Sequence, residues 1–393
     1  MTPPSRYIGP ILAGWLASLL AAAPGVSLAA DAEAELSYGE KPFSYSNVGI
    51  SLESQATPFA GEPPLSGKDK AFRGKLNLGG TNTIALIWAR ADGKLYLDLN
   101  GDLNLTNDVA GVYSSQNQQT GNYQCFSNVR IPLPDAAGAR QVVGDLNIYS
   151  YGTQPSGSFA FRSLWQGKLT LQSQDWEVGL LPDSLRNFVP ADGGKLLLRP
   201  WGKRDQAFNA HDGSLQTVPF PKKLFLNGQA YQVTLAKSSG DGSRRLQFTK
   251  EQPALGEAKI TGKFIQRMTL WGGPYQVVLD QPEAVVKLPV GTYSEAKVWL
   301  QSGELGAYES ADRARNDRKI TISEKTSAVL EMGGPLTNSV AVTRQGSSLN
   351  LSYQLVGAGG RTYTSANVDR TKPPEFVAFS GGRKVGSGKF EFG

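Results

Sequence analysis

Short segments in which apolar and polar residues alternate recur along this chain, and turn-forming residues separate them. Residues 83–88 (TIALIW) and 140–149 (RQVVGDLNIY) are two examples of strand length. A period of two places every second side chain on one face of a sheet, so such segments indicate strands. Helical periodicity is scarce, and 45 glycines suit a protein with many turns. The sequence therefore predicts an all-β protein.

One hairpin is predicted with particular clarity. Residues 223–233 read KLFLNGQAYQV, in which Asn227 and Gly228 separate two strand-like runs. Both central residues of a type I′ turn need positive φ, and Asn-Gly supplies them at low cost. Further strands are expected at residues 167–172, 195–198 and 245–248, with another turn at Asp241-Gly242.

Composition shifts and a weak repeat divide the chain. Gly-Gly-Pro follows Trp271 and again Met332, 61 residues later, and alternating strands come after each copy. We expect a signal peptide at 1–30, a large β-sandwich-type domain at 31–255, and two small β-modules at 256–330 and 331–393. A division of the large domain into two subdomains near residues 165–180 stays open.

The first thirty residues have the pattern of a secretory signal. Arg6 supplies the positive start, residues 8–23 are apolar, and Ser27-Leu28-Ala29 provides the small residues that signal peptidase reads. Cleavage is expected next to Ala30. No later stretch is long and apolar enough to span a membrane. We expect a secreted or periplasmic protein without a membrane span after signal cleavage.

Charge and cysteine content exclude some classes. The formal net charge is +6, spread along the chain without the sustained basic run of a nucleic-acid surface, so no nucleic-acid partner is expected. Cys125 is the only cysteine, so an intramolecular disulfide is impossible. A bound metal is another way to restrain an exported chain.

The strongest chemical signal is the run DLNGDLNLTND at residues 98–108. Oxygen-bearing side chains occupy every second position, and a hard cation such as Ca²⁺ binds six to eight oxygens delivered by one tight loop. The run resembles an EF-hand-type calcium loop. The candidate calcium ligands are Asp98, Asn100, Asp102, Asn104, Thr106 and Asp108, with Asn104 acting through its carbonyl and Thr106 often through water.

The run departs from the EF-hand pattern at two positions. Leu103 stands where the sharp turn normally requires glycine, and Val109 stands where a bidentate Glu normally closes the site. Asp108, one residue earlier, is the available substitute. The flanking segments are strand-like and not helical. The alternative is a surface turn stabilised by Asp and Asn side chains, without metal.

The segment KLPVGTY at residues 287–293 has a recognisable form. It resembles the LPxGxY corner of transthyretin-like and carboxypeptidase-regulatory-type β-sandwich modules. The chain as a whole resembles uncharacterised secreted bacterial β-proteins that join a DxNxD calcium loop to such modules. This resemblance implies two small immunoglobulin- or transthyretin-like β-sandwich modules at the C-terminus and names no activity.

Catalytic patterns are sparse. His211 is the only histidine, so a His/Cys zinc site lacks ligands, and His211-Asp212-Gly213 is typical of a surface turn. Glycoside hydrolysis needs only two carboxylates, and tryptophans lie near several of them. Those carboxylates are Asp145, Asp175, Glu177, Asp192 and Asp205.

The sequence leaves enzymatic activity undecided and favours its absence. The leading hypothesis is an exported calcium-binding β-protein with a structural metal loop, acting as a scaffold or binding protein. The first alternative is binding of cell-envelope or extracellular polysaccharide through exposed aromatic residues. The second alternative is a carboxylate-based glycoside hydrolase. The aromatic candidates are Trp165, Trp176, Trp201, Trp271 and Trp299.

Overall fold

The protein is all-β, as predicted. Its only helical elements among the described residues are short 3-10 turns, which are η2 (Arg90–Asp92), η3 (Val109–Gly111), η5 (Trp201–Lys203) and η6 (Ala358–Gly360). None of the helical segments in these ranges has the length and apolar character to cross a membrane. The computed structural model describes residues 30–41, 47–53, 57–66, 71–79, 82–116, 122–133, 140–150, 155–181, 195–205, 217–237, 244–309, 319–366, 369 and 371–391.

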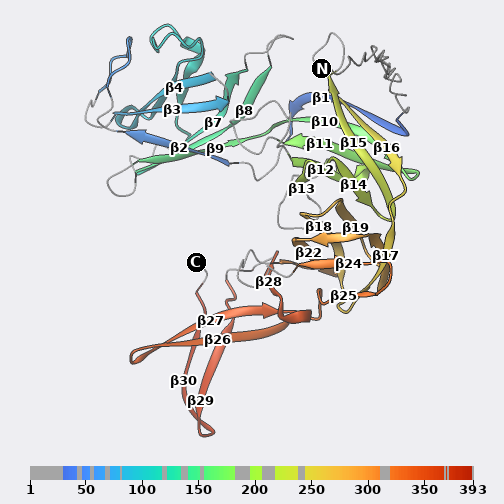
Figure 1. Cartoon of the computed structure of the whole chain (residues 1–393). Coiled ribbons are helices and arrows are strands. Elements are labelled where there is room, and N and C mark those ends of the chain that lie inside the picture. Colours follow the sequence, from blue (N-terminus) through green and yellow to red (C-terminus); the bar gives the residue numbers. More distant parts are fainter. Residues whose placement is uncertain are drawn as a thin grey trace, which may run out of the picture.

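Residues 47–161 form a separate unit, which we call the first lobe (Figure 1). Its eight-stranded sheet has the spatial order β6 (Val112–Ser114), β5 (Lys94–Leu97), β4 (Asn82–Ala89), β3 (Ala71–Gly79), β2 (Asn47–Glu53), β9 (Ser156–Phe161), β8 (Gln141–Tyr149), β7 (Tyr123–Pro132). Its core is formed by residues of β2–β5 and β7–β9, and Trp88 stacks on Phe72 there with ring centroids 5.0 Å apart.

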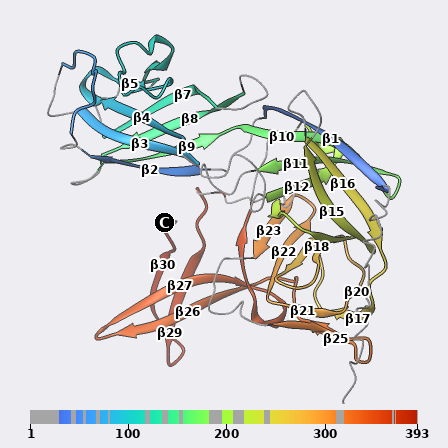
Figure 2. The ribbon, with the colours of Figure 1, turned by 45° about the horizontal axis from the view of Figure 1, so that its top comes forward.

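A second, fifteen-stranded sheet runs through the rest of the molecule (Figures 1 and 2). Its spatial order is β13 (Thr217–Pro219), β12 (Lys195–Pro200), β11 (Gln174–Leu181), β10 (Ser163–Leu171), β1 (Ala32–Glu40), β16 (Arg244–Glu251), β15 (Gln229–Lys237), β14 (Lys223–Leu226), β19 (Gln276–Asp280), β18 (Ile265–Trp271), β22 (Glu295–Ser302), β23 (Leu305–Glu309), β28 (Thr362–Ser365), β27 (Ser348–Val356), β26 (Thr337–Gln345).

The first lobe lies, in sequence, between two adjacent strands of this second sheet. β1 pairs antiparallel with β10, and its last residue Glu40 lies opposite Ser163. The other edge of β1 pairs with β16, where Ala32 faces Phe248. The chain therefore leaves the large sheet after β1, builds the first lobe and returns at β10.

The large sheet is continuous across the predicted boundary at residue 255. β14 pairs in parallel with β19, so strands from both sides of the boundary share hydrogen bonds. One core gathers residues of β18, β19, β22 and β23, and it includes Tyr293 of the LPVGTY corner. The smaller sheets are formed by β17 (Leu255–Ile260) with β20 (Val285–Pro289) and β25 (Ala328–Leu330), β21 (Gly291–Tyr293) with β24 (Ile320–Ile322), and β29 (Glu375–Ser380) with β30 (Arg383–Lys389).

Local turn chemistry agrees with the sequence where it is described. Asn227 and Gly228 have φ values of 43° and 93°, as the predicted type I′ hairpin between β14 and β15 requires. The hairpin β26–β27, which forms one edge of the large sheet, and the separate hairpin β29–β30 lie at the bottom of the view in Figure 1, whereas the first lobe lies at its top. The predicted signal peptide up to residue 29, the predicted turn at Asp241-Gly242 and the predicted turn at His211 lie outside the described residues.

Candidate metal centre

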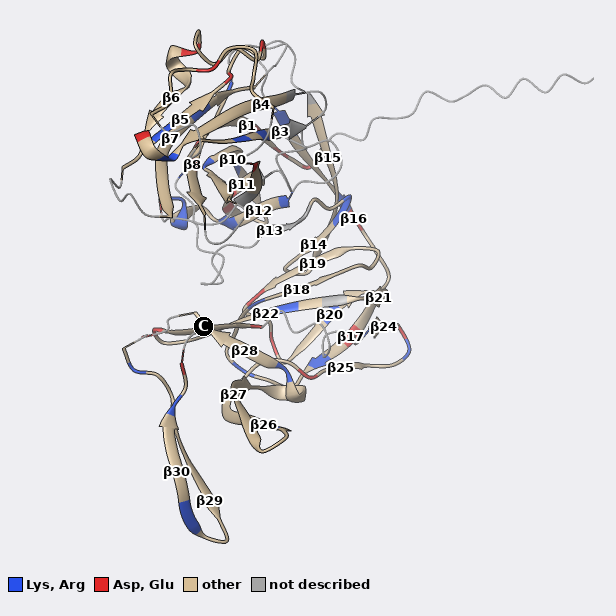
Figure 3. Ribbon diagram, turned by 90° about the vertical axis from the view of Figure 1, so that its left-hand side faces the viewer, with Lys and Arg blue, Asp and Glu red and all other residues tan. Residues whose placement is uncertain are grey.

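The run at residues 98–108, which we call the aspartate loop, begins directly after β5 and ends at η3, which leads into β6. The backbone N–H of Asp98 donates to the carbonyl of Ala85 in β4 (2.9 Å), so the first candidate ligand is attached to the sheet. In Figure 3, acidic segments gather at the end of the first lobe next to β6. The loop thus joins two strands of the first lobe and lies at its surface.

Three of the six predicted ligand residues come together. A carboxylate oxygen from each of Asp98, Asp102 and Asp108 lies within 4.8 Å of the other two. Asp98 and Asp108 are buried, whereas Asp102 is exposed. One cation can therefore reach all three carboxylates from a single point, which is the arrangement that oxygen ligation of Ca²⁺ requires.

The side chains of the other three predicted ligands form hydrogen bonds within the loop. Asn100 Oδ1 accepts the N–H of Asp102 (3.0 Å), and Asn104 Oδ1 accepts the N–H of Thr106 (3.2 Å) and its hydroxyl (2.6 Å). Asp102 Oδ1 accepts the N–H of Asn104 (2.8 Å) in the same way. These three successive Asx turns account for the alternation at Asn100, Asp102 and Asn104, because each of these side chains accepts an N–H two residues later.

Asp98 also orders the loop backbone. Its two carboxylate oxygens accept the N–H groups of Gly101 (2.8 Å) and Leu103 (3.1 Å). Leu103 has φ 62°, so it adopts the left-handed conformation that glycine normally supplies at this position. The first departure from the EF-hand pattern is therefore accommodated by backbone strain in Leu103, whose side chain is largely exposed.

Asp108 replaces the missing glutamate in position. Val109 is 83% exposed, whereas Asp108 is only 9% exposed. The Oδ2 atom of Asp108 is shielded from solvent and has no hydrogen-bond partner. The backbone N–H groups of Leu99 and Asn100 lie close enough to the Asp108 carboxylate to oppose the rise in its pKa that burial causes. The Oδ2 atom itself is buried without a partner, which is costly and leaves this oxygen available to a cation.

The pKa values follow from these contacts. Burial, and then the neighbouring charges of Asp98 and Asp102, raise the pKa of Asp108 above its usual range. The side-chain amide of Asn107 and the N–H of Asn104 lower the pKa of the exposed Asp102. At an effective dielectric constant of about 20, two unit charges about 5 Å apart repel by roughly 3 kcal/mol. A cation between Asp98 and Asp108 removes this repulsion.

A residue far from the loop in sequence anchors it. The N–H of Gly61 donates to the carbonyl of Leu103 (3.2 Å), and the Gly61 carbonyl accepts from Leu105 (2.9 Å). A Cβ atom on Gly61 would lie 2.0 Å from Asn104 Oδ1, so a larger residue there would displace the Asn104 amide. Leu105 is buried in a small core with Ala71 and Tyr96. Sequence reasoning missed Gly61, because nothing local to it signals the contact.

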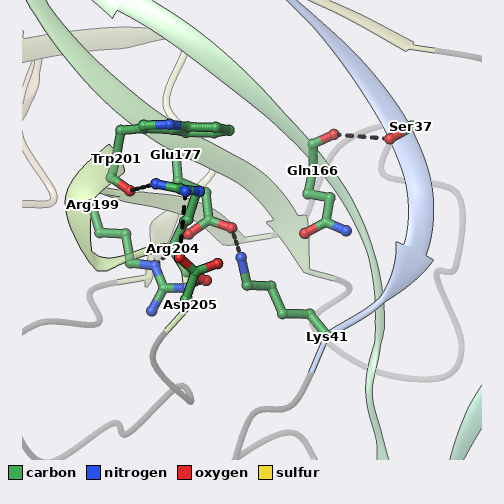
Figure 4. A network of polar contacts seen from close by, with 8 residues as sticks. All are labelled: Ser37, Lys41, Gln166, Glu177, Arg199, Trp201, Arg204 and Asp205. Atoms are coloured by element: carbon green, nitrogen blue, oxygen red, sulfur yellow. Dashed lines mark hydrogen bonds and ion pairs between the residues drawn. The ribbon is translucent and has the colours of Figure 1, made fainter.

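The carboxylates considered for glycoside hydrolysis have basic partners. Glu177 is buried and forms ion pairs with Lys41 and with Arg199 at 2.5 Å; Arg199 in turn donates to the carbonyl of Arg204 (2.8 Å; Figure 4). The remaining described pairs are Asp145 with Arg162 (3.0 Å), Asp175 with Lys168 (2.7 Å) and Asp205 with Arg204 (3.4 Å), and Asp192 lies outside the described residues.

The tryptophans considered for polysaccharide binding differ in exposure. Trp165, Trp176 and Trp299 are buried, with at most 4% of their surface exposed. Trp201 and Trp271 are half-buried. The guanidinium carbon of Arg204 lies 5.1 Å from the ring centroid of Trp201. Three of the five rings are therefore part of the core and cannot stack on a ligand.

No family model, curated protein or solved structure matches this chain.

Proposed function

We propose that this protein is an exported, non-catalytic β-scaffold whose first lobe is stabilised by Ca²⁺ in the aspartate loop. The observation that carries the proposal is the buried, unpartnered Oδ2 atom of Asp108 beside the carboxylates of Asp98 and Asp102. A divalent cation neutralises these charges and supplies the contact that Asp108 lacks.

Ligand chemistry favours calcium over other metals. The loop offers carboxylate, amide and hydroxyl oxygens only, and neither the single histidine nor the single cysteine belongs to it. Zinc prefers nitrogen and sulfur ligands, and magnesium demands a near-ideal octahedron. Calcium accepts six to eight oxygens in flexible geometry, so Asn100, Asn104 and Thr106 complete the ligand set after the three aspartates.

The proposed role of calcium is structural. The loop connects neighbouring strands β5 and β6, and Leu105 packs in the small core beneath it. A ligand that binds only the folded state stabilises it by RT ln(1 + [L]/Kd), which is about 2.7 kcal/mol at a concentration one hundred times Kd. This stabilisation is expected in the unfolding transition of the first lobe.

Calcium-dependent melting of the mature protein tests the proposal. We expect millimolar Ca²⁺ to raise the melting temperature of chelator-treated protein by several degrees. Asp98→Asn should abolish this shift. Asp369→Asn is the matched control, because Asp369 also accepts the N–H and hydroxyl of a residue two positions on, Thr371, in an isolated exposed turn. An unchanged melting temperature in calcium would refute the metal site.

Export and partner binding form the second half of the proposal. The signal-like segment supports secretion or a periplasmic location, which cell fractionation with an antibody to the mature chain checks. Polysaccharide binding is the second candidate function. The observation that favours it is an exposed aromatic side chain, Phe264, in the wall of a pocket that also contains amide side chains. A hydrolase is less supported, because this pocket and a second one near Arg361 each contain a single carboxylate residue, Glu283 and Glu331.

A further inference from the structure

A pocket of about 440 Å³ lies at the start of β18. Its walls come from residues 262–266, from residues 281–284 after β19, and from Gln301 of β22. The neighbouring strands are visible in Figure 2. This volume falls within the range of about 300–1,000 Å³ that small-molecule sites occupy.

Two residues in the pocket wall have strained backbones. Phe264 has φ 63° and Gln281 has φ 46°, although neither is glycine. Backbone hydrogen bonds stabilise both conformations. The carbonyl of Phe264 accepts the N–H of Gln301 (2.9 Å), and the N–H of Gln281 donates to the Gln266 carbonyl (2.8 Å). A bulky residue at positive φ is rare, and such strain concentrates at binding sites. Here it accompanies a Phe264 ring that is 49% exposed.

A β-bulge aims a polar side chain at the same place. β18 and β22 shift register between Ile265 and Arg267, so Gln266 is the extra residue. The amide oxygen of Gln266 is shielded from solvent and has no hydrogen-bond donor. Bulges re-aim side chains next to functional sites. The pocket therefore contains an acceptor that a ligand hydroxyl can satisfy after rotation of the amide.

We propose that this pocket binds a neutral saccharide. The exposed Phe264 ring offers a flat apolar surface for the C–H face of a sugar ring. The amides of Gln266, Gln281 and Gln301 each carry donors and an acceptor, which matches hydroxyl groups that both donate and accept. Lys263 and Glu283 are the charged residues of the lining, and their charges cancel. This chemistry favours a neutral glycan over an anionic one.

This inference rests on the polysaccharide-binding candidate and not on the calcium site. The aspartate loop belongs to the first lobe, whereas the pocket belongs to β18, β19 and β22 of the large sheet. Failure of one proposal therefore leaves the other intact, because calcium-dependent melting and glycan binding are measured separately.

The test uses the full mature chain in calcium with soluble β-glucan, xylan, mannan and α-glucan oligosaccharides as probes in isothermal titration. We expect at least one probe to bind, and Phe264→Gly to weaken its affinity at least tenfold. Phe264→Gly should keep or raise the melting temperature, because glycine adopts positive φ without strain. Gln266→Ala should also weaken binding.

Phe379→Ala is the matched control, since Phe379 is a 65% exposed phenylalanine on β29, outside the pocket lining. Its affinity should equal that of the unmodified protein. Three results would overturn the proposal: no probe binds, Phe264→Gly binds as tightly as the unmodified chain, or Phe379→Ala weakens binding as much as Phe264→Gly does.

Discussion

The first lobe and the large sheet both bury carboxylates, but they surround them differently. In the large sheet, Glu177 contacts Lys41 and Arg199, and Glu309 forms an ion pair with Arg361. In the first lobe, no basic residue of the described chain forms an ion pair with Asp98 or Asp108. The buried carboxylates of the large sheet therefore have basic side chains as counter-ions, whereas the Asp98 and Asp108 carboxylates have none among the described residues. Elsewhere in the first lobe, Arg73 pairs with Glu62 (2.6 Å).

The presence or absence of a basic partner also changes the pKa of a buried carboxylate. Burial raises the pKa of Glu309 in β23, and the guanidinium of Arg361 opposes that rise. Burial likewise raises the pKa of Asp108, but the neighbouring Asp98 and Asp102 raise it further. Both shifts make stability depend on pH, but only the unpaired acidic cluster also links stability to the concentration of a cation that binds it.

The largest expected effect comes from removing an internal counter-ion. Arg199→Met leaves Glu177 buried with a single basic partner, so we expect a loss of about 3–5 kcal/mol in the free energy of unfolding. Urea unfolding with and without calcium measures it. Arg245→Met is the control, because its pair with Glu33 is exposed and such pairs contribute at most about 1 kcal/mol. Equal losses in the free energy of unfolding in both variants would contradict the larger role of the buried ion pair.

Asp108→Asn tests whether calcium is the counter-ion of the buried Asp108 carboxylate. The variant removes a buried, repelled charge, so without calcium at pH 7 it should be at least as stable as the unmodified protein. In calcium at one hundred times the Kd of the unmodified protein, it should lack about 2.7 kcal/mol of stabilisation. Melting curves in chelator and in calcium measure both quantities. A variant that is less stable in chelator would contradict the proposed repulsion.

Calcium affinity should fall as the pH falls through the raised pKa of Asp108. Protons compete with the metal there, so affinity should drop up to tenfold per pH unit for one displaced proton, or about 1.4 kcal/mol. Without calcium, lower pH favours the folded state instead of weakening it. The folded state holds this proton more tightly than the unfolded state, so the contribution of Asp108 to stability decreases as pH rises from the ordinary carboxyl pKa through the raised one.

Isothermal titration with calcium at a series of pH values checks this dependence. Asp108→Asn should flatten the profile over the window set by Asp108. A pH profile that is identical in the two proteins would assign the titration to another group.

The smallest expected effect concerns loop strain. Leu103→Gly places glycine at φ 62°, and relief of a left-handed side chain should stabilise the lobe by about 1 kcal/mol, with or without calcium. Gly101→Ala tests the opposite change, because it places a side chain at φ 79° in open space, so only backbone strain is added. It should destabilise the lobe by a similar amount. Melting of both variants measures the pair.

Local features of the fold could be predicted because their causes are local. The alternation at residues 83–88 lies within β4, and Asn227-Gly228 forms the turn that its backbone preferences require. Long-range pairing could not be predicted in this way. Nothing in β1 indicates that Ser37 lies opposite Gln166, or that Glu35 lies opposite Arg245. These partners are chosen by the packing of whole sheets.

The candidate site was predictable to a similar extent. The spacing of oxygen-bearing side chains placed Asp98, Asp102 and Asp108 in one predicted set of six calcium ligands, and carboxylate oxygens of these three lie within 4.8 Å of one another. Gly61 was not predictable, since its contact depends on how a distant segment passes the loop. The Phe264 pocket was missed because a bulge and positive φ values have no clear sequence signal in glutamine and phenylalanine.

The pairing of β1 with β10 makes the first lobe an insertion between two strands of the large sheet. Glu40 and Ser163 are neighbours across a ladder, so a short reverse turn could join them directly and the remaining sheet would keep every strand. The first lobe and the large sheet can therefore fold at different times. The large sheet can assemble only after its C-terminal strands have been synthesised, whereas the first lobe is complete earlier and can fold, and bind the proposed ion, before them.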